Sequence, residues 1–220
     1  MREQAPVAIL HNYPIHYKHL LFTELARQGL CFEVLFTAGA STDRIETQWL
    51  QSVPYRHRVG FTGPYERASR WRTARFLWRS LDDIQPALVI ISGYYDVAAW
   101  TAWTWAALHH RPRILWAEST LLDHPRRFYK ELPKRFFVAQ CDFAHVYGTA
   151  SKAYIESLGM PDHRIITKMA AADVQRFLHA APPAGNGPPY KVLLYVGRFS
   201  PEKNLEFLFR AFARLSQRPS

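Results

Sequence analysis

Residues 86–108 read PALVIISGYYDVAAWTAWTWAAL, and this stretch decides the fold class. Residues 88–91 form a continuous, largely β-branched apolar run, which is typical of a parallel strand covered on both faces. Residues 97–108 have the length and the alanine content of a packed helix. Residues 92–96 interrupt the apolar character, and a membrane span needs about twenty uninterrupted apolar residues. The stretch therefore predicts a buried strand and a helix of an α/β domain.

Short apolar runs and helix-length segments alternate on both sides of this stretch, without internal repeats. Strands are expected at residues 7–10, 32–37, 55–59, 88–91, 113–116, 143–147 and 164–168. Helices are expected at residues 18–28, 67–81, 97–108 and 151–158. This alternation predicts a parallel sheet, so we expect a doubly wound, Rossmann-like α/β domain over residues 1–179.

Residues 180–189 read AAPPAGNGPP, which is too rich in proline and glycine for a helix or a strand. We interpret them as a linker to a second Rossmann-like domain over residues 190–220, which holds only a first strand and a first helix. One strand and one helix cannot close a core. The apolar side chains of residues 190–220 are therefore expected to stay partly exposed.

The composition indicates a globular protein with an anionic partner. Hydrophobic residues make up 48% of the 220 positions, and Lys and Arg outnumber Asp and Glu by 28 to 18. The formal net charge is +10. A protein of this charge could bind nucleotide-sugar phosphates, anionic lipids or nucleic acids, so the charge alone does not identify the partner. Cys31 and Cys141 are too few for a disulfide framework or a zinc site, which favours a reducing, cytoplasmic compartment. Both are expected to be buried.

Basic residues gather in two segments that also carry aromatic side chains. In residues 67–81, five arginines accompany tryptophan, leucine and alanine at helical spacing: Arg67, Arg70, Arg72, Arg75 and Arg79. This amphipathic pattern fits an ordinary surface helix, with its apolar stripe on the sheet, or a helix attracted to an anionic membrane. The second segment, residues 126–137, is interpreted as a solvated face.

Residues 190–204 read YKVLLYVGRFSPEKN, which predicts a buried strand, a loop and a helix that begins near Pro201. Gly197 permits a sharp turn out of the strand. Free N–H groups at a helix N-terminus favour an anion, and Arg198 and Lys203 add two positive charges. The pattern predicts a diphosphate site, although a helix cap with two solvated cations is the alternative.

The run GRFSPEKN at residues 197–204, followed by LEFLFRAF, resembles the donor-site opening of the group 1 retaining glycosyltransferases, which have the GT-B fold. Three upstream stretches also resemble motifs of that family and occur in the same order along the chain: NYPIHYKHLLF at 12–22, GTAS at 148–151 and ADVQRF at 172–177. The resemblance covers nearly the whole chain. At the last stretch the family usually shows Gly-Val-Asp, whereas this chain has Ala171, Ala172 and Asp173.

The resemblance implies transfer of a sugar, with retention, from a nucleotide-diphosphate sugar to a hydroxyl of a carbohydrate, lipid or small-molecule acceptor. It implies that Arg198 and Lys203 hold the diphosphate, beside Gly197, and that neither a metal nor another cofactor is needed. The family's second domain carries two glutamates separated by seven residues, which would lie beyond Ser220. The chain is thus expected to be an incomplete enzyme, either a fragment or one completed by a partner chain.

Loops that follow strands hold the remaining candidates, because ligands of parallel α/β folds bind beyond the carboxyl ends of strands. On the acceptor side these are His16, Lys18, Asp96 and Asp173. A histidine of the family is replaced here by Glu118, the candidate catalytic residue. Each of three candidates also has a purely structural alternative. Glu118 could be a carboxylate that holds its loop, Lys18 a solvated side chain, and Asp173 a turn residue. The histidines lack partners at metal-ligand spacing, so no metal site is expected.

The rival interpretation is a non-catalytic basic protein that binds nucleic acid or a membrane surface. No stretch resembles a nucleic-acid-binding motif, so we expect no nucleic-acid partner. The apolar run at residues 7–10 is too short for a signal peptide. We therefore expect a cytoplasmic enzyme, with peripheral contact to anionic membrane at its inner face.

Overall fold

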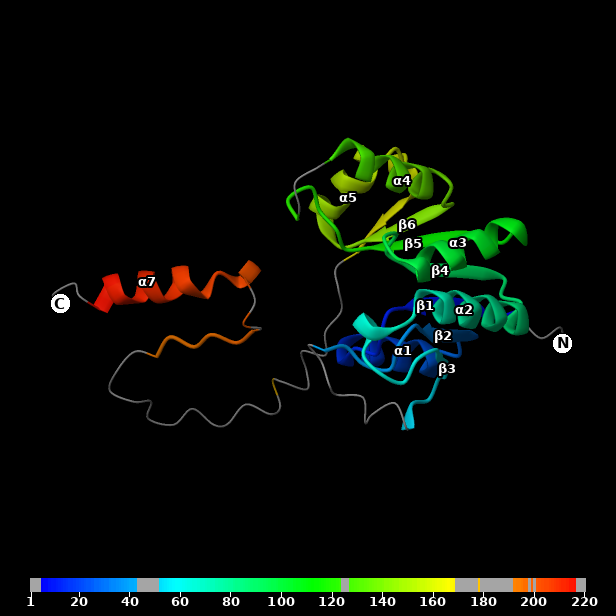
Figure 1. Ribbon diagram of the computed structural model, residues 1–220, viewed down its shortest axis with the longest axis horizontal. Coiled ribbons are helices and arrows are strands. Elements are labelled where there is room, and N and C mark those ends of the chain that lie inside the picture. Colours follow the sequence, from blue (N-terminus) through cyan, green and yellow to red (C-terminus); the bar gives the residue numbers. More distant parts are fainter. Residues whose placement is uncertain are drawn as a thin grey trace. The chain divides into compact units, whose positions relative to one another are not determined.

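The chain divides into two units, residues 1–175 and 176–220, which are described separately. The computed structural model describes residues 5–42, 52–123, 127–168, 178, 192–197, 199 and 201–216, without the side chains of Glu202 and Ser216. Figure 1 labels the helices and strands of both units.

A parallel sheet organises the first unit, and the described residues contribute seven strands to it in the order β3-β2-β1-β4-β5-β6-β7. Val7 of the interior strand β1 lies opposite Phe32 of β2 and Leu88 of β4. The strands are β1 (Val7–His11), β2 (Phe32–Phe36), β3 (Arg56–Val59), β4 (Leu88–Ser92), β5 (Arg113–Ala117), β6 (Phe143–Val146) and β7 (Ile165–Thr167).

Helices lie in most of the connections between successive strands and cover both faces of the sheet, although the described residues between β2 and β3 form no α-helix. They are α1 (His16–Arg27), α2 (Arg70–Ile84), α3 (Val97–Leu108), α4 (Phe128–Ala139) and α5 (Gly148–Ser157). Single turns of 3-10 helix occur at Tyr65–Arg67 and Asp162–Arg164. Gly29 and Gly159 follow α1 and α5 with φ of 78° and 105°, a conformation that favours glycine.

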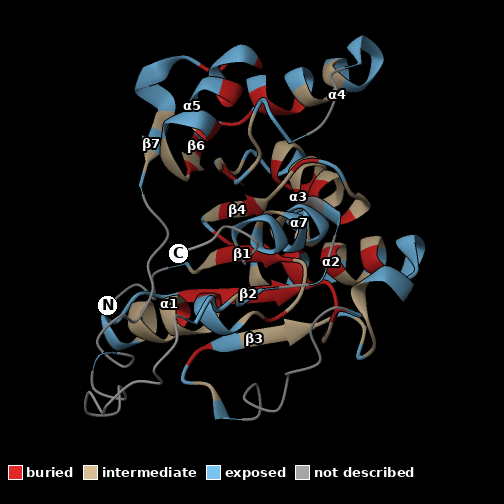
Figure 2. Ribbon diagram, turned by 90° about the vertical axis from the view of Figure 1, so that its left-hand side faces the viewer, coloured by how far each residue is buried: buried red, intermediate tan, exposed pale blue. Residues whose placement is uncertain are grey.

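Two hydrophobic cores follow from the alternation of side chains along the strands. Ala8 and Leu10 belong to the core under α2, α3, α4 and α5, whereas Ile9 belongs to the core under α1, where Phe22 is fully buried. Buried residues line the central strands in Figure 2, where every residue of β2 is buried. Helices on both faces of a parallel sheet confirm the doubly wound, Rossmann-like fold.

The expected strands of the first unit all occur, and each end differs from the expected one by at most one residue. Helix α3 has the predicted bounds. Helix α1 begins two residues earlier than predicted and α5 three residues earlier, at Gly148. The prediction for Cys31 was wrong, because it is exposed just before β2, whereas Cys141 is buried.

The second unit contains helix α7 (Leu205–Ser216), preceded by a 3-10 turn at Pro201–Lys203. The predicted strand is wrong for its described part, because residues 192–197 are not in a strand and Leu194 is 79% exposed. A strand is stable only beside another strand that pairs with its backbone groups, and the described residues offer none here. A helical turn begins at Pro201, as predicted, but it is a 3-10 turn, and the α-helix starts only at Leu205. The predicted linker 180–189 lies outside the described residues.

Candidate functional site

The candidate site of the first unit lies at the carboxyl edge of the sheet, where the strand order reverses between β1 and β4. Loops on either side of such a switch point lead away from each other and leave a crevice for a ligand. Here a hydrogen bond crosses the switch point, because the Asn12 side-chain amide donates to the Tyr95 hydroxyl at 3.1 Å. The loops that follow β1 and β4 are therefore held side by side.

Lys18, in the first turn of α1, has a buried ammonium group beside this edge. Its side chain is 3% exposed, and Nζ lies 3.3 Å from Oε1 of Glu118, which follows β5. Nζ also donates a hydrogen bond to the Tyr147 hydroxyl and lies 3.8 Å from the centre of the Trp116 ring. A carboxylate, a hydroxyl and an aromatic face thus replace the water around the charge. We call these four residues the Lys18 cluster.

Burial dominates the electrostatics of the cluster. It lowers the pKa of Lys18, against the opposite effect of the Glu118 carboxylate. Burial, and then the positive charge of Lys18, lower the pKa of His145 and bring that of His11 down to about 4. His11 and His145 are therefore neutral at neutral pH. The Glu118 side chain is 57% exposed, so the ion pair is open to solvent on the carboxylate side.

Tyr147 is a residue of the candidate site that the sequence interpretation missed. Its hydroxyl oxygen accepts hydrogen bonds from Lys18 and, at 2.8 Å, from the indole N–H of Trp116. Both acceptor positions of the oxygen are thus used, which leaves the hydroxyl proton for a third group. Burial raises the pKa of Tyr147, so the phenol stays protonated. The signal that could have found it is its position directly after strand β6.

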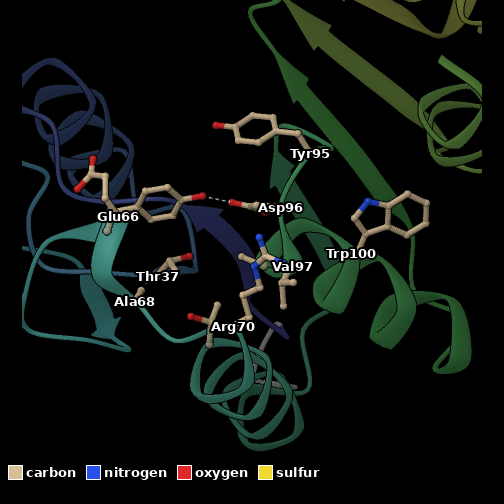
Figure 3. A pocket seen from close by; sticks show the side chains of 11 residues that line it. Thr37, Glu66, Ala68, Arg70, Tyr95, Asp96, Val97 and Trp100 are labelled. Carbon is tan, nitrogen blue, oxygen red and sulfur yellow. Dashed lines mark hydrogen bonds between the residues drawn. The ribbon is translucent and has the colours of Figure 1, made fainter. Parts of the chain in front are cut away.

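A cavity of about 450 Å³ lies beside the switch point and contains Asp96 (Figure 3). One carboxylate oxygen of Asp96 accepts from the Ala99 N–H at 2.7 Å and caps α3, and the other accepts from the Tyr65 hydroxyl. A dashed line in Figure 3 marks this second hydrogen bond at Asp96. The lining includes these polar side chains: Thr37, Tyr65, Glu66, Arg70, Thr73, Tyr95 and Asp96.

The structure brings some of the predicted residues together and not others. Lys18 and Glu118 are in contact, which corrects the alternative of a solvated Lys18. Asp96 lies in the neighbouring cavity, and His16 is exposed at the start of α1. Gly197 and the exposed Lys203 belong to the second unit, whereas Arg198 and Asp173 lie outside the described residues. Over the described part of the chain, no group of three histidine, cysteine or acidic side chains is placed to hold a metal ion.

Solved structures that this chain resembles include UDP-N-acetylglucosamine 2-epimerases and a protein in complex with UDP. HepE of Anabaena, in complex with UDP and glucose, matches with a TM-score of 0.57 at 11% identity, over 78% of this chain and 46% of that chain. A UDP-N-acetylglucosamine 2-epimerase matches with a TM-score of 0.52 at 14% identity, over 75% and 48%. The epimerase of Neisseria meningitidis bound to UDP-GlcNAc matches with a TM-score of 0.50 at 15% identity, over 74% and 45%.

At these identities the likeness shows the fold. The chain spans about half the length of the solved structures that it matches. No protein-family model and no curated protein matches the sequence. Within the described residues, no helix combines the length and the apolar character that crossing a bilayer requires.

Proposed function

We propose that this chain is the acceptor-side part of a nucleotide-sugar-dependent glycosyltransferase of the GT-B type, which transfers a sugar to an acceptor hydroxyl with retention. The observation that carries the proposal is the Lys18 cluster, a desolvated cation in contact with an open carboxylate at the ligand-binding edge of a Rossmann-like sheet. The solved structures of the same fold with bound UDP and UDP-glucose support a nucleotide sugar as substrate.

Each residue of the cluster has a chemical task in this proposal. Glu118 has solvent access, so its carboxylate is the group that accepts a proton from an acceptor hydroxyl. Lys18 fixes the position of that carboxylate, and its buried positive charge stabilises negative charge that develops nearby. The free hydroxyl proton of Tyr147 is the donor that orients the acceptor. In the second unit, Arg198 and Lys203 would neutralise the leaving diphosphate, as the resemblance implies.

The test is sugar transfer by the protein expressed from its natural reading frame, with UDP-glucose and UDP-GlcNAc as donors. Glu118→Gln should lower turnover while the affinity for the donor stays nearly unchanged. Glu24→Gln is the matched control, because Glu24 is a carboxylate on the surface of α1 that pairs with Arg27. Full turnover in Glu118→Gln would return Glu118 to the role of a loop-holding carboxylate.

Epimerisation of the nucleotide sugar at C2 is the second candidate, favoured by the lysine of lowered pKa beside a carboxylate and by the epimerases of the same fold. Inversion at C2 by acid–base chemistry removes a proton and returns one to the opposite face. In deuterium oxide an epimerase would place deuterium at C2 without any acceptor. Release of UDP that depends on an acceptor, with no deuterium at C2, is the result expected for the transferase.

A further inference from the structure

The outer faces of α2 and α3 form an apolar groove of about 480 Å³, outside the Lys18 cluster. The two helices lie side by side over the same core. Residues 71, 74, 75 and 78 of α2 recur at helical spacing and all line the groove, whereas Leu77 and Leu81 point into the core. The largest side chains along the groove are those of Trp71, Trp78 and Trp100.

Trp71 does not belong to the core that holds α2 on the sheet. Its side chain is 84% exposed at the start of the helix, although tryptophan carries one of the largest apolar surfaces of any residue. The sequence interpretation placed the apolar stripe of α2 on the sheet, and Leu77 and Leu81 fulfil that role. An apolar groove with an exposed tryptophan at one end indicates a surface that binds something.

The charges beside the groove are positive and uncompensated. Five exposed arginines follow one another along residues 67–79, and none of them forms an ion pair with another described residue: Arg67, Arg70, Arg72, Arg75 and Arg79. By contrast, Arg58 on β3 pairs with both Glu33 and Asp83. The arginine row therefore offers free guanidinium groups to an anionic partner.

We propose that this α2–α3 surface docks on the face of an anionic lipid bilayer. Guanidinium groups hydrogen-bond to lipid phosphates, and tryptophan is favoured at the boundary between headgroups and acyl chains. The apolar stems of Arg75 and Arg79 line the groove while their charged ends stay in the headgroup layer. An anionic bilayer offers partners to both the arginines and the tryptophan, since it places many negative charges above a continuous apolar layer.

This docking goes beyond the proposed reaction and sets the position of the cavity. Val97 and Trp100 line both the groove and the cavity that contains Asp96. Both belong to α3, which forms one wall of the cavity in Figure 3. A protein held by the α2–α3 surface therefore keeps this cavity beside the headgroup layer.

Vesicle co-sedimentation of the 220-residue chain tests the proposal. Vesicles of phosphatidylcholine mixed equally with phosphatidylglycerol should bind the protein, and vesicles of phosphatidylcholine alone should not. Replacing Arg72, Arg75 and Arg79 together by Gln should weaken partitioning about 100-fold, because each cation near an anionic surface contributes about a fivefold gain. Trp71→Ala should weaken it roughly tenfold through lost apolar burial.

The matched control replaces three cations that lie outside the surface, Arg56, Arg164 and Lys168, by Gln. This variant loses the same net charge and should bind almost as the parent does. Circular dichroism and thermal melting check that every variant is folded. Equal binding to both vesicle types would overturn the proposal, as would equal losses in the two triple variants. Retention on duplex DNA without vesicle binding would overturn it in favour of a nucleic-acid surface.

Discussion

Acidification should destabilise the protein through a single buried histidine, His11, at the end of β1. Its side chain is 7% exposed, and burial together with Lys18 lowers its pKa to about 4, against 6.5 for a free histidine. Between these two pH values the unfolded chain binds a proton that the folded protein does not bind. The free energy of unfolding must therefore fall as the pH is lowered from 6.5 toward 4. At about 1.4 kcal/mol per pH unit, the loss amounts to about 3 kcal/mol.

Urea denaturation of the parent protein and of His11→Asn, measured between pH 7 and pH 4, isolates this effect. Since the Tyr13 carbonyl can only accept, Nδ1 of His11 donates to it at 3.0 Å, and an asparagine amide can replace that donor without titrating. Other ionisable groups titrate in both proteins, so their contributions cancel in the difference. The parent should lose about 3 kcal/mol more than the variant over this window.

Parallel curves for the two proteins would refute this reasoning, because they would mean that folded His11 takes up the proton as readily as the unfolded chain does. A third variant tests the cause. Lys18→Met removes the positive charge that contributes to the lowered pKa of His11, so it should make the pH dependence shallower. An unchanged slope in Lys18→Met would assign the whole effect to burial.

Three further outcomes are expected. Lys18→Met should change the stability at pH 7 by no more than about 1 kcal/mol in urea denaturation, because the half-exposed Glu118 can hydrate, yet it should abolish turnover. Asp96→Ala removes the cap of α3 and should cost about 0.5–2 kcal/mol by the same measurement, whereas Asp96→Asn retains a capping oxygen and should cost less. Arg198→Ala or Lys203→Ala should weaken the binding of UDP by about 1.5–3 kcal/mol in calorimetry. Unchanged affinity in both variants would remove this loop from the donor site.

Most strands of the first unit could be predicted because they are short apolar runs that pack into the two cores of a parallel sheet. The edge strand β3 is an exception, since it reads RHRV and none of its residues is fully buried. The bounds of α3 could be predicted for a local reason, since Asp96 caps its first turn and the sequence changes character at that point. The run at residues 192–196 has the same apolar character, but its described part is not a strand. An apolar run is necessary for a buried strand, whereas pairing depends on neighbours that local sequence does not reveal.

The candidate site could be predicted only as a set of loops at the carboxyl edge of the sheet. Lys18 and Glu118 follow β1 and β5, which lie on either side of β4, so the sequence placed both at the same edge of the sheet without predicting their contact. Burial of Lys18 was not predicted, because it depends on α1 beginning at His16 and on the rings of Trp116 and Tyr147. The partnership of Tyr65 with Asp96 joins residues 31 positions apart through a 3-10 turn, which periodicity does not show.

The position of β1 between β2 and β4 has a consequence for the synthesis of the chain on the ribosome. Strand β2 follows after one short helix, so β1 gains its first neighbour early, but its other edge pairs with β4, about 80 residues further along the chain. At a synthesis rate of roughly 5–20 residues per second, that edge waits for several seconds with its backbone groups unpaired. During this time Ala8 and Leu10 have no β4 beside them, and an open strand edge is a template for pairing with another chain. Nascent chains of this protein should therefore depend on chaperones until β4 leaves the ribosome.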